Sequence, residues 1–159
     1  MVIKMKYYIK QKWFSWGDVF HIYDADGNER FAVEGEVFTF GKRLHLYDMK
    51  GQELAYIEQE LLTFLPCYHI SIGGSETAKV VKEFTFFSPE YTVEGPDWKV
   101  TGDFFDYEYE IAAGSRTVAS ISKEWFTLGD AYEIDIKDDA DTLTALAVVL
   151  VIDACLDRK

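Results

Sequence analysis

The sequence is short of cysteine and of positive charge, and each shortage removes a class of protein. Cys67 and Cys155 are the only cysteines in 159 residues. They are too few and too far apart for a disulfide framework or a paired-cysteine metal site, so we expect two reduced thiols. Lys and Arg number 16 against 28 Asp and Glu, a formal net charge of −12. This acidic balance disfavours binding to nucleic acid, which requires a positive surface.

Long apolar runs and catalytic motifs are also missing. The unbroken apolar run in the C-terminal segment covers residues 145–152, whereas a membrane span needs about 20 such residues. The N-terminal segment has no apolar stretch typical of a signal peptide. We therefore expect a cytoplasmic protein without a transmembrane segment. No GxSxG elbow, phosphate-binding loop or GxGxxG motif occurs, and we expect no enzyme activity, no catalytic residues and no cofactor.

Aromatic residues are abundant, and proline is scarce. The chain has 10 Tyr and 12 Phe against 3 Pro, and 48% of its residues are hydrophobic. Aromatic side chains pack well on half-buried pleated surfaces, so this composition favours strands. The length and the absence of a linker predict a single domain over residues 1–159, with a sizeable core.

A repeated pattern organises most of the chain. Residues 13–22 match residues 125–134 almost position by position, and looser copies occupy residues 38–48, 62–70 and 84–93. In each copy two apolar alternations flank a short connection, which is typical of a β-hairpin with two strands per copy. The repeat predicts about a dozen short strands over residues 1–137. A meander of that length avoids exposed edges by closing into an antiparallel barrel.

The C-terminal segment has a different pattern. Residues 142–156 contain no Gly or Pro and are apolar on both helical faces, with Leu146 on one and Val148 on the other. A helix that is apolar all round must be buried on all sides. We therefore expect a helix over about residues 140–156, threaded along the barrel axis, with Asp138, Asp139 and Asp141 capping its start.

Several segments resemble those of the LURP-one-related family. They are residues 7–12, 46–48 with Gly51, 53–57 and 132–136. The resemblance implies a tubby C-terminal-like fold, a twelve-stranded barrel around a central apolar helix. The wider group includes tubby proteins, which bind phosphoinositide headgroups through basic residues, and phospholipid scramblases. No headgroup-binding basic residue of the tubby proteins matches a position in this sequence.

Two patterns suggest metal ligands but have simpler explanations. His21, His45 and His69 are spaced evenly at 24 residues. Each lies between apolar neighbours, so strand alternation predicts that the imidazoles point outward as part of the repeat. Asp24, Asp26 and Asn28 match the first, third and fifth positions of a calcium loop, but the sixth and twelfth positions do not match. A hairpin turn fits this segment better, and we expect no bound metal.

A lysine stripe is the one local excess of positive charge. The stripe consists of Lys4, Lys6, Lys10 and Lys12. Alternation places these lysines on one face of the first strand and the apolar residues Ile3, Met5, Tyr7 and Ile9 on the other. The stripe is either a solvated face that discourages edge pairing or a surface that docks on anionic groups. Four lysines contribute about 4 kcal/mol at an anionic membrane, which corresponds to weak, salt-sensitive binding.

The leading hypothesis from the sequence is a non-catalytic binding or scaffold protein. Its partner would be another protein or an anionic lipid surface. The alternative is a small-molecule-binding protein or an enzyme with a pocket at a barrel mouth. A helix on the axis fills the space in which such a ligand would otherwise bind, which favours the first hypothesis.

Overall fold

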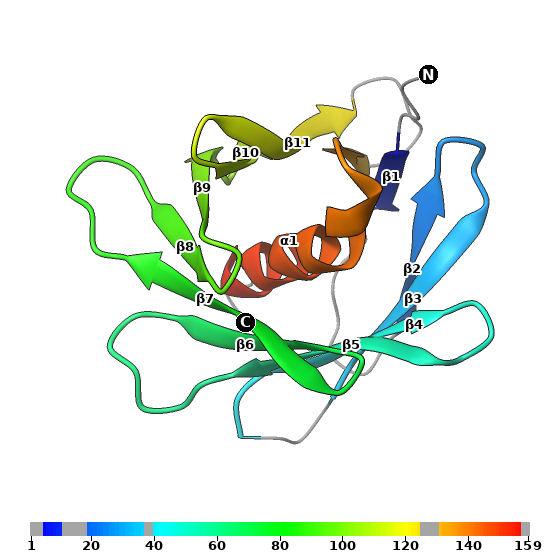
Figure 1. The fold of residues 1–159 in the computed structure, drawn as a ribbon, viewed down its shortest axis with the longest axis horizontal. Helices are drawn as coiled ribbons and strands as arrows, with labels where there is room; N and C mark the ends of the chain where they lie inside the picture. The colour runs from blue at the N-terminus through cyan, green and yellow to red at the C-terminus, as the bar shows by residue number, and fades with distance from the viewer. Residues whose placement is uncertain (1–4, 11–18, 37–39, 125–130, 157–159) are drawn as a thin grey trace.

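Twelve antiparallel strands close into a barrel around one helix in a computed structural model, which describes residues 5–10, 19–36, 40–124 and 131–156 (Figure 1). The elements are β1 (Met5–Lys10), β2 (Val19–Asp24), β3 (Glu29–Gly35), β4 (Arg43–Asp48), β5 (Glu53–Gln59), β6 (Cys67–Ile72), β7 (Ser75–Glu83), β8 (Glu90–Glu94), β9 (Trp98–Asp103), β10 (Glu108–Ala113), β11 (Arg116–Glu124), β12 (Ala131–Ile136), the 3-10 helix η1 (Asp139–Asp141) and α1 (Thr142–Leu156). The predicted fold class is confirmed.

Every strand pairs with its neighbours in sequence, and β1 closes the ring against β12. The closing ladder runs from the pair Met5 and Ile136 to the pair Lys10 and Ala131. Closure provides both edges of every strand with a partner strand, which removes the unpaired backbone groups that would otherwise favour aggregation.

Two of the hairpin turns share one hydrogen-bonding arrangement, in which an Asp side chain accepts bonds from backbone N–H groups. The Asp24 side chain accepts hydrogen bonds from the backbone N–H groups of Asp26 and Asn28 at 3.0 and 2.9 Å. Asp48 accepts the equivalent bonds in the turn between β4 and β5. Gly27 follows at a φ of +82°, which glycine adopts at little cost. The segment after Asp24 is therefore a hairpin turn, as the sequence predicts.

The expectation that each repeat copy is one hairpin is wrong where the structure describes it. Residues 62–64 and 84–87 lie in the connections after β5 and β7, not in strands. The first halves of two other copies, at residues 13–18 and 125–128, lie outside the described residues. The first half of the remaining copy covers residues 38–41, of which residues 38–39 are outside the described residues and residues 40–41 lie in the connection after β3. The hairpins are instead formed by the second half of a copy and the strand that follows it. Alternation alone could not separate a strand from an exposed connection with the same pattern.

The helix α1 fills the centre of the ring (Figure 1). Residues 145–152 are at most 1% exposed on every face of the helix, which confirms the predicted axial helix. The Asp138 side chain caps η1 by accepting a hydrogen bond from the Ala140 backbone N–H. Within the described residues, no helix is both long enough and apolar enough to cross a membrane.

Candidate functional site

The barrel interior is occupied by α1 and by the inward side chains of the strands. The surfaces accessible to a binding partner are therefore the outer face and the two ends of the barrel. A surface hollow of about 380 Å³ lies at one end, where Met5, Asp24 and Asp139 line it. A smaller hollow of about 230 Å³ lies at the other end, lined by Leu65 and residues 82–89.

Apolar side chains gather at the second of these ends. Because successive strands run in opposite directions, the connections after β3, β5, β7 and β9 all emerge there. Of ten large apolar side chains exposed in the described part of the chain, eight lie on these four connections: Phe40, Leu61, Leu62, Phe64, Phe84, Phe86, Phe87 and Phe105. We call this set the apolar loop end. Exposed apolar clusters of this kind mark binding surfaces.

Neighbouring connections at the apolar loop end touch one another. A Cβ at Gly41 would lie 2.8 Å from the Leu61 side chain, and Leu65 lines a hollow together with residues 82–89. The rings of Phe84 and Phe86 meet edge to face, with centroids 5.3 Å apart. The α1 C-terminus lies at the same end, because the Lys42 Nζ donates a hydrogen bond to the Ala154 carbonyl at 2.6 Å.

The lysine stripe is described at Lys6 and Lys10, whereas Lys4 and Lys12 lie outside the described residues. The Lys6 Nζ lies 3.1 Å from the Glu133 carboxylate on β12. The Lys10 Nζ lies over the Tyr23 ring, 5.1 Å from its centroid. Lys6 therefore balances an acidic neighbouring strand, and its pairing reduces the charge available for docking.

The three histidines point outward, as predicted, but the structure does not bring them together. They lie on β2, β4 and β6, and each is separated from the next by one strand. From β2 to β6 there are four strand spacings, about 19 Å, too far for all three imidazoles to coordinate one ion. Each histidine instead faces glutamate: His21 faces Glu29, His45 faces Glu36 and Glu53, and His69 faces Glu60 and Glu76.

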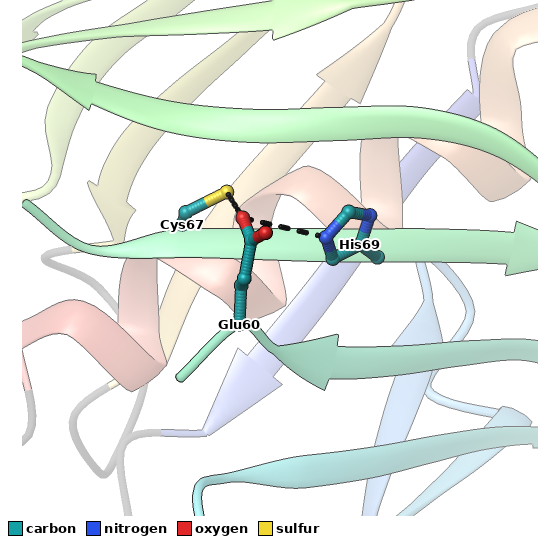
Figure 2. A group of neighbouring side chains, drawn as sticks. All are labelled: Glu60, Cys67 and His69. Atoms are coloured by element: carbon teal, nitrogen blue, oxygen red, sulfur yellow. Dashed lines mark hydrogen bonds and ion pairs between the residues drawn. The ribbon is translucent and has the colours of Figure 1, made fainter. Parts of the chain in front are cut away.

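One cluster near these histidines was missed by the sequence reasoning. Cys67, Glu60 and His69 converge on the outer face of the barrel (Figure 2). The Cys67 Sγ donates a hydrogen bond to the Glu60 Oε2 at 3.0 Å, and the His69 Nε2 lies 3.5 Å from the same oxygen. Cys67 is the first residue of β6 rather than part of a connection. The sequence signal was a Cys and a His two residues apart on one strand, which share a face.

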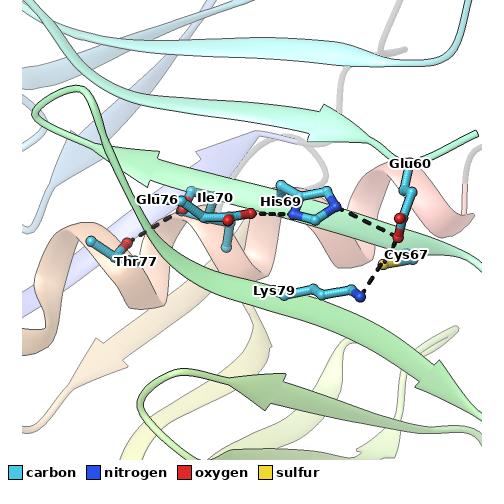
Figure 3. Close-up of polar contacts among 7 residues, drawn as sticks. All are labelled: Glu60, Cys67, His69, Ile70, Glu76, Thr77 and Lys79. Carbon is cyan, nitrogen blue, oxygen red and sulfur yellow. Dashed lines mark hydrogen bonds and ion pairs between the residues drawn. The ribbon is translucent and has the colours of Figure 1, made fainter.

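Further polar groups surround the cluster (Figure 3). Glu76 contacts the His69 Nδ1, and the Lys79 Nζ lies 3.7 Å from the Glu60 Oε2. Burial, with Glu60 adding to it, raises the pKa of the Cys67 thiol to about 12. The hydrogen bond from Cys67 is the main cause that lowers the pKa of Glu60. The thiol is therefore protonated at neutral pH and poorly suited to act as a nucleophile.

The second cysteine lies at the end of α1. Both cysteines are free, as predicted, and Cys155 is half-buried. Burial raises the pKa of the Cys155 thiol to about 11, so this group is also protonated at neutral pH. Neither cysteine has the depressed pKa of a reactive thiolate.

Comparison with known proteins gives matches along nearly the whole chain. The family model described as LURP-one-related matches residues 5–153. The uncharacterized protein YxjI of Bacillus subtilis is 40% identical over 149 residues, which cover 94% of this chain and 92% of that protein. An X-ray structure of an Arabidopsis thaliana protein aligns with a TM-score of 0.64 at 19% identity, covering 96% of this chain and 91% of that one, and so shares the fold.

Proposed function

This chain belongs to the LURP-one-related family, and from that premise we propose that it is a non-catalytic binding protein that docks on a lipid bilayer through the apolar loop end. The observation that carries this proposal is the gathering, on four connections at one end, of eight of the ten large apolar side chains that are exposed among the described residues. The filled barrel interior supports surface binding over an internal ligand, because residues 145–152 occupy the axis.

The magnitudes favour the apolar loop end over the lysine stripe as the main contact. Burying one exposed Phe or Leu side chain contributes about 1.5 to 3 kcal/mol. Phe64 and Phe87 are 96% and 100% exposed, and Leu62 is also fully exposed. These three side chains alone could contribute about 5 to 9 kcal/mol before the costs of immobilisation. The four lysines contribute about 4 kcal/mol, and the pairing of Lys6 with Glu133 lowers that further.

A bilayer suits this surface better than a folded protein partner. The apolar side chains lie on separate connections, so a protein partner would need a matching pocket for each, whereas lipid adapts to their shape. Lys82 lines the same hollow as Phe84 and Phe87, and a lysine beside inserted apolar groups extends its amine to the headgroup level. The net charge of −12 opposes attraction to anionic lipid. We therefore expect binding that depends little on salt or on anionic headgroups.

Vesicle co-sedimentation tests this proposal. The wild-type protein should bind phosphatidylcholine vesicles at both physiological and high salt. The double variant Phe64→Ser and Phe87→Ser should lose at least tenfold in affinity. The matched control is Met49→Ser, because Met49 is 48% exposed on a turn at the opposite end, and it should bind as the wild type does.

Two results would contradict the proposal. Wild-type protein that stays in the supernatant at every salt concentration would favour a protein partner. Binding that requires phosphatidylserine, disappears at high salt and is lost in Lys6→Gln with Lys10→Gln would instead assign the contact to the lysine stripe.

A further inference from the structure

We propose that Glu60, Cys67 and His69 form a zinc site on the outer face of the barrel. The argument for this site does not rest on the docking proposed above. Thiolate, imidazole and carboxylate are the ligands that zinc takes in proteins. Calcium and magnesium prefer oxygen ligands alone, so this donor set selects against them.

The positions of the three donor atoms suit one tetrahedral ion. The Cys67 Sγ, the His69 Nε2 and a Glu60 oxygen lie within 4.8 Å of one another. Zinc bonds of about 2.0 to 2.3 Å place tetrahedral ligands roughly 3.3 to 3.8 Å apart. The observed separations of 3.0 Å between Glu60 and Cys67 and 3.5 Å between Glu60 and His69 are close to that range. The third separation, between the Cys67 Sγ and the His69 ring nitrogen, is at most 4.8 Å.

The three ligands are held by the sheet and by a second carboxylate. Cys67 and His69 share the outer face of β6, and the Glu60 backbone N–H donates to the Cys67 carbonyl at 2.8 Å. Glu76 contacts the His69 Nδ1, which leaves Nε2 directed at Glu60 (Figure 3). A carboxylate on the second imidazole nitrogen is the usual support of a zinc-bound histidine, because it fixes the orientation and tautomer of the ring.

The neighbouring repeat offers an internal comparison. His45 also lies between two glutamates, Glu36 and Glu53. Two residues before His45 the chain has Arg43, where the His69 repeat has Cys67. Within the described ranges, no second group of three such donor side chains lies as close together. Cys67 therefore gives the His69 repeat a third donor side chain, which the His45 repeat lacks.

Lys79 is the group that zinc must displace. Its Nζ lies 3.7 Å from the Glu60 Oε2, and no cation can stay there beside a bound ion without repulsion. Zinc binding releases the Cys67 thiol proton to solvent. The resulting thiolate, the Glu60 carboxylate and a neutral imidazole balance the charge of Zn²⁺, and water completes the tetrahedron. Removing the Lys79 amine should therefore strengthen zinc binding.

Zinc would also fix one connection of the apolar loop end. Glu60 and Cys67 flank the connection that carries Leu61, Leu62 and Phe64. An ion that joins the two flanking residues closes the base of this connection.

Zinc titration of the untagged full-length protein against a chromophoric chelator tests the site. Wild type should bind one tight equivalent, and cobalt should give the absorption of a tetrahedral thiolate complex. Cys67→Ser and His69→Gln should each weaken zinc binding at least tenfold, and Glu76→Gln should weaken it about 10- to 100-fold. Lys79→Met should bind zinc several-fold more tightly. His45→Gln is the matched control and should bind as the wild type does.

The variants Cys67→Ser and His69→Gln test the zinc site only if they fold. Serine is nearly the same size as Cys67, and His69 is partly exposed, so both variants should fold, which a thermal melt checks. Folded wild-type protein that takes up no zinc would overturn the site. So would affinity that is unchanged in both Cys67→Ser and His69→Gln, equal or weaker binding by Lys79→Met, or a loss in His45→Gln as large as that in His69→Gln. Vesicle binding by the metal-free protein tests the docking proposal separately.

Discussion

The Tyr132 hydroxyl donates a hydrogen bond to the Asp153 Oδ2, which joins the last strand of the barrel to the axial helix. Tyr132 is 1% exposed. Asp153 as a residue is half-buried, but its Oδ1 is shielded from solvent and accepts no hydrogen bond from the described part of the chain. Burial raises the pKa of Asp153 from 3.8 to about 7, although the bond from Tyr132 opposes that shift. The helix therefore carries a carboxyl group that favours its neutral form.

This group should make the barrel less stable as the pH rises. The folded pKa of about 7 exceeds the unfolded value of 3.8, so below about pH 3 both states are protonated. As the pH rises towards 7 the unfolded chain ionises first, and the free energy of unfolding falls by roughly 4 kcal/mol in total. Asp153→Asn should match the wild type at about pH 3 and be more stable by roughly 2 to 4 kcal/mol at pH 8, measured by urea denaturation.

Tyr132→Phe provides the complementary variant. It removes the hydrogen bond that favours the ionised carboxylate, so stability should fall more steeply between pH 5 and pH 8 than in the wild type. Parallel pH profiles for the wild type and Asp153→Asn would show that Asp153 ionises normally in the folded state.

A charge on the axial helix should unfold the protein. Val148 is 0% exposed, and Val148→Asp places a carboxylate in the core without a partner. We expect a loss of about 4 kcal/mol or more in the free energy of unfolding. Val19→Asp is the control, because Val19 is 53% exposed, and it should cost less than about 1 kcal/mol. Similar melting curves for the two variants would contradict burial of this helix face.

Gly102 should not tolerate a side chain. Its φ is +138°, and a Cβ there would lie 2.6 Å from both the Glu108 carbonyl oxygen and the Tyr109 Cα on β10. Gly102→Ala should cost at least about 2 kcal/mol in stability. Gly51 has a φ of +84°, and a Cβ added there would meet nothing within 4 Å, so Gly51→Ala should cost only about 1 kcal/mol. Chemical denaturation compares the two variants, and equal losses would exclude the steric explanation.

His45 should titrate above the usual range for histidine. Burial lowers the pKa of His45, but hydrogen bonds with Glu53 and Glu36 outweigh it and raise the pKa above 6.5. The stabilisation by protonated His45 is complete below pH 6.5 and is lost as the pH rises through the raised pKa. NMR titration of the ring protons should show this shift. Glu36→Gln should lower the pKa of His45, and a value unchanged in that variant would contradict the ion pair.

The sequence by itself determined the class of fold, because the relevant signals are local. A two-residue alternation, repeated from hairpin to hairpin, specifies strands with one buried face. The run from residue 145 to residue 152 is apolar on every helical face, and burial on all sides requires surrounding structure. Together these patterns leave few arrangements other than a barrel around a helix. They also predicted that His21, His45 and His69 point outward, since alternation fixes which side of a strand a residue occupies.

Only the tertiary structure decided which surfaces and clusters form, because these depend on pairing between distant segments. Residues 62–64 and 84–87 alternate as strands do, yet the pairing of β5 with β6 and β7 with β8 leaves them as connections. Because successive strands alternate in direction, the connections that carry these apolar side chains lie at the same end of the barrel. Glu60 follows β5, and Cys67 and His69 belong to β6, so only the register between these strands brings the three donors together. That register is set jointly by the buried faces of both strands and by the geometry of the connection between them, which the alternation of either strand alone does not specify.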